Sequence, residues 1–269
     1  MSTAAIRTVI TGVSGRMGAT LVRMVRDAPG FRVTGGTDKP GSPVLGRDVG
    51  VVAHLDPLQL MTVASLAEVL PGCDVVIDFT SPEASLEHAR LCARAKKALV
   101  IGTTGFSAEA KAELLELARQ VPIVASPNMS IGVNLVVEMA AQLAARLGED
   151  FDVEVLEAHH RMKKDAPSGT AVWLADQLVK ALGRSPDDVR TSRVGMVGAR
   201  PHEEIGVQAL RGGDVVGEHT VFFFGDGERV ELTHRATSRD QFGRGAVRAA
   251  RWAVSQPPGL YDMSHVLRP

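Results

Sequence analysis

Near its amino end the chain reads Arg7-Thr8-Val9-Ile10-Thr11-Gly12-Val13-Ser14-Gly15-Arg16-Met17-Gly18. A short β-branched run passes through glycines into a stretch of helical spacing, which predicts a strand, a tight turn and a helix. Glycines at such a turn let backbone amides approach a pyrophosphate at the start of the helix. Their spacing is G-x-x-G-x-x-G, which departs from the common G-x-G-x-x-G dinucleotide fingerprint. The turn alone therefore leaves two interpretations open, a nucleotide site and a plain glycine-rich turn.

A carboxylate and a cation follow the second predicted strand. Asp38 lies 20 residues after Gly18 (38 − 18), where the fingerprint expects an acid that binds ribose hydroxyls, and Lys39 comes next. A carboxylate suits the ribose diol of NAD, whereas a cation suits the 2′-phosphate of NADP. We therefore expect a site that accepts NADPH or NADH, the alternative being a surface ion pair.

The first half of the chain alternates short apolar runs with stretches of helical spacing. This alternation is typical of a Rossmann-like, doubly wound parallel sheet, so we expect an α/β fold. The interval 39–57 breaks the rhythm with prolines and glycines, which marks an excursion or loop whose role the sequence does not reveal. The expected strands are 7–11, 31–37, 75–79, 98–101 and 122–125, and the expected helices are 17–28, 82–95 and 107–119.

Beyond Asn134 the pattern changes to a long helix, a charged loop followed by its own helix, and then several strands in succession. Strands without helices between them predict a mixed or antiparallel sheet, hence a second α+β domain. Here we expect strands at 151–156, 205–210, 215–224 and 228–236, and a last helix at 239–256. We place a dinucleotide-binding domain at 1–130, with 240–269 packing back onto it, and a substrate-binding and oligomerisation domain at 131–239.

An aromatic run stands in one of the later strands. Phe222, Phe223 and Phe224 are consecutive, and successive side chains of a strand point to opposite faces. The run therefore predicts a strand that is buried on both faces, one of which is expected to meet another subunit. An ordinary two-sided core is the alternative.

Composition limits the partners of the protein. The 30 basic and 31 acidic residues nearly cancel, which does not support a broad attraction to nucleic acid or to an anionic membrane. No apolar run suggests a membrane span or a secretory signal. Cys73 and Cys92 both stand among apolar residues, so buried reduced thiols are expected rather than a disulfide. We expect a cytoplasmic protein whose partners are small molecules.

A charged loop precedes one of the helices of the second half. It reads Glu157-Ala158-His159-His160-Arg161-Met162-Lys163-Lys164-Asp165-Ala166-Pro167-Ser168-Gly169-Thr170-Ala171. Ser168 is a good N-cap, so the amides near Gly169 and Thr170 and the positive end of the helix dipole favour an anion. Lys163 adds a full charge, and His159 or His160 can carry protons near neutral pH. Together they predict a carboxylate-bearing substrate and a proton-coupled step.

Two other interpretations of this loop remain. The loop could be a solvated polar connection. It could also bind a metal through Glu157, His159 and His160, but adjacent histidines on a strand point to opposite faces and rarely share one ion. We therefore expect no metal ligands.

Two later loops follow predicted strands of the first half. They read Gly102-Thr103-Thr104-Gly105 and Ser126-Pro127-Asn128-Met129-Ser130. In open α/β sheets ligands lie outside the carboxyl ends of the strands. Both loops are therefore candidate ligand contacts, although helix-capping turns use the same residue types.

These segments together resemble the dihydrodipicolinate reductase family, the 4-hydroxy-tetrahydrodipicolinate reductases of the diaminopimelate route to lysine. The resemblance spans nearly the whole chain, and its Glu-x-His-His and Pro-Ser-Gly-Thr-Ala elements are highly specific in combination. It is carried by 12–18, 102–105, 126–130 with 132–134, 157–171, 211–220 and 234–242.

The resemblance implies an enzyme that passes hydride from NADPH or NADH to a cyclic unsaturated imine dicarboxylate, giving tetrahydrodipicolinate with loss of water. It implies that His159 is a proton donor and acceptor, that Lys163 is a second acid, and that His160, Gly169 and Thr170 hold substrate carboxylate. It also implies a homotetramer that joins the sheets of its second domains. Cofactor contacts are implied for Gly12, Val13, Ser14, Gly15, Arg16, Met17, Asp38, Lys39, Gly102, Thr103, Thr104, Ser126, Pro127, Asn128 and Met129.

Some family members carry Glu and Arg where this chain has Asp38 and Lys39, so the preference between NADH and NADPH stays open. Two rival functions are another amino-acid-linked NAD(P) dehydrogenase and a non-catalytic NAD(P)H sensor. The loop from His159 to Thr170 argues against the other dehydrogenase, and a sensor would have no need for the cluster of His159 and Lys163.

Overall fold

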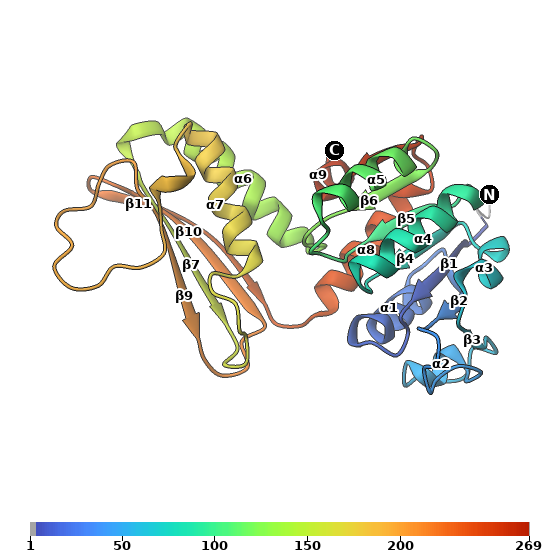
Figure 1. The fold of residues 1–269 in the computed structure, drawn as a ribbon. Helices are drawn as coiled ribbons and strands as arrows, with labels where there is room; N and C mark the ends of the chain where they lie inside the picture. The colour runs from blue at the N-terminus through green and yellow to red at the C-terminus, as the bar shows by residue number, and fades with distance from the viewer. Residues whose placement is uncertain (1–3, 269) are drawn as a thin grey trace. The chain divides into compact units, whose positions relative to one another are not determined.

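The computed structural model describes residues 4–268, which form two compact units. The first unit contains the chain up to Ile131 and the chain from Asp240 onward, and the second unit is Gly132–Arg239. The chain thus leaves the first unit once and returns to it with its last helices, as the change from green to red in Figure 1 shows.

A parallel seven-stranded sheet forms the centre of the first unit, in the order β12-β6-β5-β4-β1-β2-β3. The order reverses at β1, which pairs with β2 on one side and β4 on the other. Loops that leave the carboxyl ends of β1 and β4 therefore turn to opposite faces, and a crevice opens there in such sheets. The strands are β1 (Ile6–Thr11), β2 (Phe31–Thr37), β3 (Thr62–Val63), β4 (Val75–Asp78), β5 (Ala98–Ile101), β6 (Pro122–Ala125) and β12 (Gly259–Tyr261).

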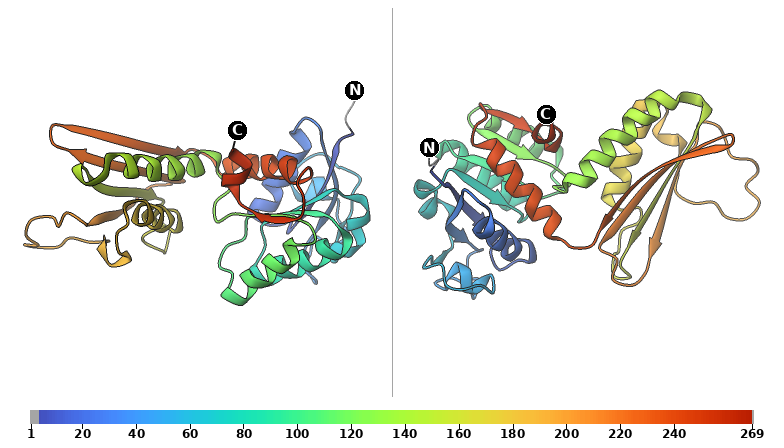
Figure 2. Two further views of the ribbon diagram at one scale, coloured as in Figure 1. Left: turned by 90° about the horizontal axis from the view of Figure 1, so that it is seen from above. Right: turned by 180° about the vertical axis from the view of Figure 1, so that it is seen from behind.

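Helices cover both faces of this sheet, so the unit is doubly wound and confirms the predicted α/β fold (Figure 2). On β1 the buried side chain of Ile10 packs with residues of α1 and α8, while its neighbour Val9 packs on the opposite face with residues of α4 and α5. The helices are α1 (Arg16–Asp27), α2 (Val49–Val52), α3 (Leu66–Val69), α4 (Pro82–Ala95), α5 (Ala108–Ala118), α8 (Asp240–Ala253) and α9 (Met263–Leu267), with a 3₁₀ turn at Leu70–Gly72.

The interval 39–57, expected as a loop, contains regular structure. The carboxylate of Asp48 accepts hydrogen bonds from the backbone N–H groups of Gly50, Val51, Leu58 and Leu60, at 2.7 to 3.1 Å. One side chain thereby caps α2 and holds the middle of the excursion against the residues that follow it. The prolines and glycines concealed this, because the order comes from one capping residue and not from a periodic pattern.

A mixed five-stranded sheet forms the second unit, in the order β11-β10-β7-β9-β8, as predicted. The central strand β7 runs antiparallel to β10 and parallel to β9. Helices α6 and α7 pack together with the buried side chains of one sheet face. The elements are α6 (Ile131–Leu147), β7 (Asp152–His159), α7 (Gly169–Leu182), β8 (Val189–Arg190), β9 (Ile205–Arg211), β10 (Gly217–Gly225) and β11 (Glu228–Ala236), with 3₁₀ turns at Gly148–Asp150 and Pro186–Asp188.

One helix of the described chain, Ile131–Asp150, is long and apolar enough to cross a membrane by length and composition alone. This corrects the expectation that no apolar run suggests a span. Core helices pass the same test, and Val133, Val137, Ala140 and Ala144 of α6 pack into the hydrophobic core of the second unit.

The aromatic run on β10 is buried on one face only. Phe223 is fully buried against α6 and α7, but Phe222 and Phe224 stack on each other on the other face, with their ring centroids 5.5 Å apart. Phe224 is 37% exposed, and Leu210 of β9 is 54% exposed. The expected burial of both faces is therefore not met within this chain, because its two helices cover one side of the sheet.

Candidate active site

The glycine turn after β1 has the geometry of an anion cradle. Gly12 has a φ of +65°, and a Cβ atom on Gly18 would lie 2.0 Å from the carbonyl oxygen of Gly12. Glycine is therefore required where the turn folds back onto the start of α1. The N-cap Gly15 offers no side chain to the first amides, and the first turn of α1 contains no acid. The predicted cofactor residues from Gly12 to Met17 thus surround a helix start that fits a pyrophosphate.

Asp38 is bound to this turn. Its carboxylate, 6% exposed, accepts hydrogen bonds from the backbone N–H groups of Ser14 and Lys39, both at 2.9 Å. Burial alone would raise the pKa of Asp38, but the donors from Ser14, Ser42 and Lys39 lower it below its usual value. The carboxylate is therefore ionised at neutral pH, and the exposed Lys39 stands beside it. The structure brings these two residues to the glycine turn.

The other two predicted cofactor loops come together at the same edge of the sheet. Gly102–Thr104 follows β5 and Ser126–Met129 follows β6, and these strands are neighbours. Thr103, Thr104, Ser126 and Pro127 line one cavity of about 340 Å³. Met129 differs from the rest, because its side chain is 1% exposed and belongs to the hydrophobic core. Met129 therefore offers almost no surface to a ligand.

In the second unit, a buried carboxylate holds His159. Glu157 is fully buried near the end of β7, and its Oε2 lies 2.6 Å from Nδ1 of His159. A carboxylate partner at Nδ1 places the proton on that nitrogen and leaves Nε2 to exchange a proton with a ligand. A Cβ atom on Gly217 would lie 3.0 Å from this Nε2, so glycine keeps the approach open.

Arg211, to which the sequence assigned no role, balances the charge of Glu157. It forms two parallel hydrogen bonds to the carboxylate, both 2.8 Å long, and β9 carries it directly beside His159. The backbone N–H of Ser168 donates a further bond of 3.0 Å to Glu157. Burial alone would raise the pKa of Glu157, but Arg211, His159 and Ser168 lower it. Glu157 thus ties β7, β9 and the start of α7 into one network.

Two residues that the sequence predicts to bind an anion, Gly169 and Thr170, lie at the start of α7. Ser168 caps the helix by accepting the backbone N–H of Ala171, and the first turn contains no acid. A Cβ atom added to Gly169 would meet no atom within 4 Å, so this corner is open. Thr170 lies in the same turn, and the carbonyl of the half-buried His160 accepts the backbone N–H of Lys163. These positions fit a carboxylate.

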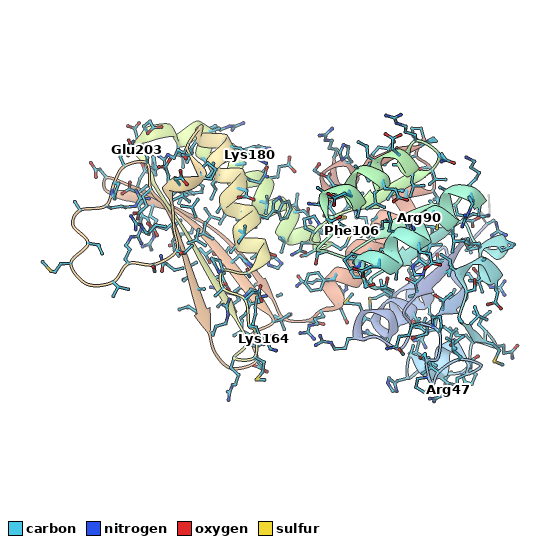
Figure 3. All side chains as sticks on the ribbon, viewed as in Figure 1. Arg47, Arg90, Phe106, Lys164, Lys180 and Glu203 are labelled. Atoms are coloured by element: carbon cyan, nitrogen blue, oxygen red, sulfur yellow. The ribbon has the colours of Figure 1, made fainter. Side chains whose placement is uncertain are left out.

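Lys163 turns inward, whereas its neighbour does not. Its ammonium group lies 2.9 Å from the carboxylate of Asp165, and its side chain is 21% exposed. Lys164 is exposed at the tip of the loop (Figure 3). The structure thus distinguishes the half-buried Lys163, which the sequence analysis singled out, from the exposed Lys164 beside it.

Burial controls the acidity of the two histidines at this site. Burial lowers the pKa of His159, and the hydrogen bond that His159 donates to Glu157 only partly offsets this effect. His219, which the sequence did not single out, is 4% exposed, and its ring meets that of His159 edge to face at 5.3 Å. Burial lowers the pKa of His219 to about 4. Both rings are therefore neutral at pH 7 before a ligand binds.

The alternatives for this loop can now be assessed. The oxygens of Glu157 are taken by Arg211, His159 and Ser168, and residues 4–268 contain no group of three or more His, Cys, Asp or Glu side chains arranged to hold a metal. A solvated charge run is also a poor description, because Glu157 is fully buried and the side chain of His159 is 12% exposed.

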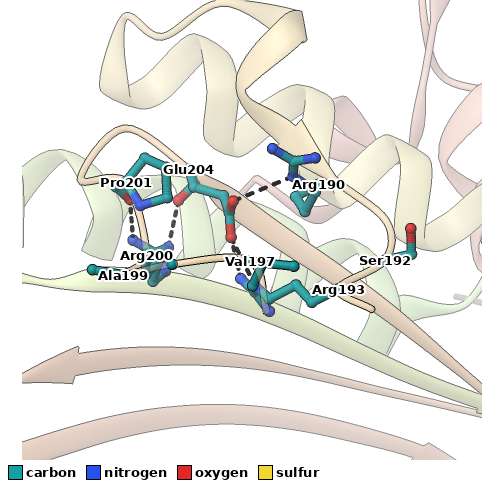
Figure 4. A pocket seen from close by; sticks show the side chains of 9 residues that line it. Arg190, Ser192, Arg193, Val197, Ala199, Arg200, Pro201 and Glu204 are labelled. Atoms are coloured by element: carbon teal, nitrogen blue, oxygen red, sulfur yellow. Dashed lines mark hydrogen bonds and ion pairs between the residues drawn. The ribbon is translucent and has the colours of Figure 1, made fainter. Parts of the chain in front are cut away.

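A separate cavity of about 370 Å³ lies beneath the long loop between β8 and β9. Arg190 and Arg193 pair with the buried Glu204 (Figure 4). Arg193 and Arg200 also pair with Glu154 on β7. The two glutamates raise the pKa of Arg193. Because these cations already have partners, we interpret the cluster as a support for the loop.

The fold and the two sites define a class. A doubly wound α/β unit whose glycine turn fits a pyrophosphate, followed by a mixed-sheet unit with a buried carboxylate–histidine pair, is the arrangement of a two-domain oxidoreductase. The solved structure of an amine dehydrogenase from Mycobacterium smegmatis shares this fold, with a TM-score of 0.63 and 18% identity over 98% of this chain and 96% of that one.

Comparisons with known sequences name the family. Residues 6–129 match the model of the dihydrodipicolinate reductase N-terminus, and residues 132–267 match that of its C-terminus. The 4-hydroxy-tetrahydrodipicolinate reductase of Myxococcus xanthus is 62% identical over 97% of both chains, and that of Anaeromyxobacter dehalogenans is 58% identical over 97% of both. A dipicolinate-bound dihydrodipicolinate reductase from Paenisporosarcina sp. TG-14 superimposes with a TM-score of 0.77, at 27% identity over 96% of this chain and 97% of that one.

The chain belongs to the dihydrodipicolinate reductase family. It is an NAD(P)H-dependent oxidoreductase with 4-hydroxy-tetrahydrodipicolinate reductase activity, a step of lysine biosynthesis through diaminopimelate. The resemblance seen in the sequence is thereby confirmed.

The buried His219 makes the stability of the protein depend on pH. Because its pKa is about 4 in the folded state and about 6.5 when unfolded, stability is full above pH 6.5 and is lost as the pH falls toward 4. When the pH is lowered from 7 to 5, we expect protonation linked to His219 to lower the free energy of unfolding by about 2 kcal/mol. Urea unfolding of wild type and His219→Gln at both pH values checks this, and equal losses in the two proteins would contradict it.

Proposed function

We propose that His159 and Lys163 supply the protons for the reduction of 4-hydroxy-tetrahydrodipicolinate to tetrahydrodipicolinate, and that His160, Gly169 and Thr170 hold the substrate carboxylates. The observation that carries this proposal is the 2.6 Å hydrogen bond between Glu157 and His159 beside the open start of α7. It supplies an oriented imidazole next to an anion-binding helix end.

The roles follow from the chemistry of the substrate. Reduced nicotinamide supplies the hydride when bound, and hydride addition to an electron-poor double bond leaves negative charge that must be neutralised. Lys163 carries a positive charge that stabilises such a charge, and His159 can donate from Nε2 once it is protonated. An anionic dicarboxylate opposes the burial effect that keeps His159 neutral, so substrate binding favours the protonated imidazole.

We further propose that the first unit binds the dinucleotide through the predicted cofactor residues and that the second unit binds the substrate. The uncapped start of α1, the glycines of its turn and the ionised Asp38 support this assignment. The two cysteines are free and buried, which supports a cytoplasmic enzyme.

The direct test of the activity is loss of reduced-nicotinamide absorbance on substrate made in place from pyruvate and aspartate semialdehyde by the preceding synthase. Rapid oxidation that depends on the synthase is expected. Tight cofactor binding without such oxidation would instead favour a non-catalytic sensor.

Replacement of either proposed proton donor should separate catalysis from cofactor binding. We expect His159→Gln and Lys163→Met each to lower kcat by about a hundredfold or more, the usual range for loss of general acid catalysis. The Kd of NADPH should change by less than about twofold, because both residues lie in the substrate unit. Titration of nucleotide fluorescence measures the Kd.

Lys164→Met is the matched control, because it removes the neighbouring exposed cation, and we expect it to retain the wild-type kcat. If Lys164→Met lowers turnover as much as Lys163→Met, or if NADPH affinity collapses while turnover survives, the assignment of roles is wrong.

Lys39 should distinguish the two cofactors. A cation beside Asp38 suits the 2′-phosphate of NADPH, which NADH lacks. We expect Lys39→Ala to weaken NADPH binding by about fivefold, the loss of about 1 kcal/mol for one exposed ion pair, and to leave NADH binding unchanged. Calorimetric titration with each cofactor measures this. Arg32→Ala, at the other end of β2, is the control, and equal losses for both cofactors would remove the 2′-phosphate argument.

We propose that four copies associate through the open face of the second-unit sheet. Phe222, Phe224 and the exposed Leu210 lie on this face, which also carries Glu231 and Arg229 opposite the two phenylalanines, and the exposed apolar side chains favour cover by another copy. We expect Phe224→Glu to reduce the mass of the assembly, measured by light scattering, because it places a charge in the contact. Leu115→Glu, on an exposed helix position of the first unit, should keep the wild-type mass. A monomeric wild type would contradict the proposal.

A further inference from the structure

A second buried carboxylate lies in the first unit, at the sheet edge where the predicted cofactor loops meet, and it has no role in the proposed reaction. Asp78 is the last residue of β4, next to the point where the strand order reverses, and it is 0% exposed. The rest of β4 consists of Val75, Val76 and Ile77, all buried and apolar. An ionised group at the end of such a strand is costly unless several donors surround it.

Five donor groups do surround it. Oδ1 of Asp78 lies 3.0 Å from the backbone N of Thr80, 2.8 Å from its hydroxyl, 2.7 Å from that of Ser85 and 3.3 Å from that of Thr103. Nδ1 of His88, from α4, meets Oδ2. Burial alone would raise the pKa of Asp78, but these donors, His88 first among them, lower it. The carboxylate is therefore charged at neutral pH.

The groups bound to Asp78 belong to loops that we assign to the cofactor. Thr103 belongs to the loop after β5. In the same loop the backbone N–H of Gly102 donates a hydrogen bond of 2.9 Å to the backbone carbonyl of Asp78. The ring of Phe79 packs against Gly102, and a Cβ atom on Gly102 would lie 2.2 Å from ring carbons of Phe79. The position of this loop is thus set by Asp78 and the residue after it.

The glycine turn is connected to the same group through Thr80. A Cβ atom on Gly12 would lie 3.0 Å from Cγ2 of Thr80, so the methyl group of Thr80 packs directly against the turn. The hydroxyl and amide of Thr80 are both held by Asp78. One carboxylate therefore fixes the chain beyond three neighbouring strands, β1, β4 and β5.

We propose that Asp78 is a positioning residue for the dinucleotide: with His88 it holds the glycine turn and the Gly102–Thr104 loop in the arrangement that receives the cofactor. This inference rests on the assignment of these two loops to the cofactor under the proposed function. Asp78 acts through Thr80 and Thr103. It holds the two loops in place before the cofactor binds, so that cofactor binding does not have to order them at a cost in affinity.

The test measures cofactor affinity directly in the full-length enzyme. Asp78→Asn keeps the shape of the side chain but removes its charge. We expect the Kd of NADPH and that of NADH to rise by the same factor, about tenfold, which corresponds to about 1.4 kcal/mol. The KM of the substrate, measured at saturating cofactor, should stay within about twofold of wild type. Such a split between cofactor and substrate would not follow from a general loss of folding.

A second pair of variants keeps the test valid if Asp78→Asn does not fold. His88→Ala should raise the Kd of both cofactors, and His88→Gln, whose amide can still donate to Asp78, should restore most of the affinity. Asp74→Asn is the control, because it removes the ion pair with Arg7 at the opposite end of the same strand. We expect it to lower the free energy of unfolding without changing either Kd.

The outcomes distinguish failure of the positioning role of Asp78 from failure of the cofactor assignment. If wild type binds both cofactors and the Asp78 and His88 variants bind them equally well, the positioning role is overturned and the cofactor assignment stands. If wild type binds neither NADPH nor NADH, the cofactor assignment itself fails. A rise in Kd that Asp74→Asn reproduces would show that strand stability alone is responsible, and would also overturn the positioning role.

Discussion

The ion pair between Glu157 and Arg211 is the contact on which the second unit depends. The carboxylate is fully buried and the guanidinium is 20% exposed, and together they connect β7 to β9. Removal of one partner of such a pair leaves a buried charge without compensation, which costs about 3–5 kcal/mol. The same carboxylate also accepts hydrogen bonds from His159 and from the N–H of Ser168, so the proposed proton donor and the start of α7, which we propose binds substrate carboxylate, share one support.

The first unit uses the same physical device at a different place. Asp78 ends a central strand and is fully buried. Its carboxylate pairs with Nδ1 of His88, as that of Glu157 pairs with Nδ1 of His159 in the second unit. In both cases burial opposes the charge and hydrogen bonds from several elements sustain it. A carboxylate held in this way fixes the loops around it before any ligand arrives, which is the condition for preorganised binding and catalysis.

Much of the fold could be predicted where local signals agree with the tertiary structure. Helix α4 begins and ends as predicted, because Ser81 caps its start, proline occupies its first position, and Lys96 ends it in the left-handed conformation. Strand β12 could not be predicted, since Gly259–Tyr261 become a strand only by pairing with β6. Burial of β10 on both faces is not reached within this chain, since Phe224 is 37% exposed, and cover of that face by another subunit stays a prediction. Local alternation does not say what covers each face of a sheet.

The candidate site divides in the same way. The glycine turn, Asp38 and the charged loop were visible because each combines residue types whose chemistry is local. The burial of Glu157 has a weaker signal in the sequence: Val153 and Val155 point inward on β7, and two residues further on the inward position holds this acid. Arg211, His219 and His88 gave no comparable signal, because their partners lie 54, 51 and 10 residues away in sequence.

The sequence by itself determined the two-domain α/β architecture, the family and the residue types of both sites, because hydrophobic periodicity, turn chemistry and motif spacing are properties of short segments. Tertiary structure decided which charges are buried, which histidines are neutral, which of two adjacent lysines turns inward, and which carboxylates hold the loops. The reason is that a pKa, an ion pair or an exposed face depends on neighbours brought together by folding, and no segment contains its own neighbours.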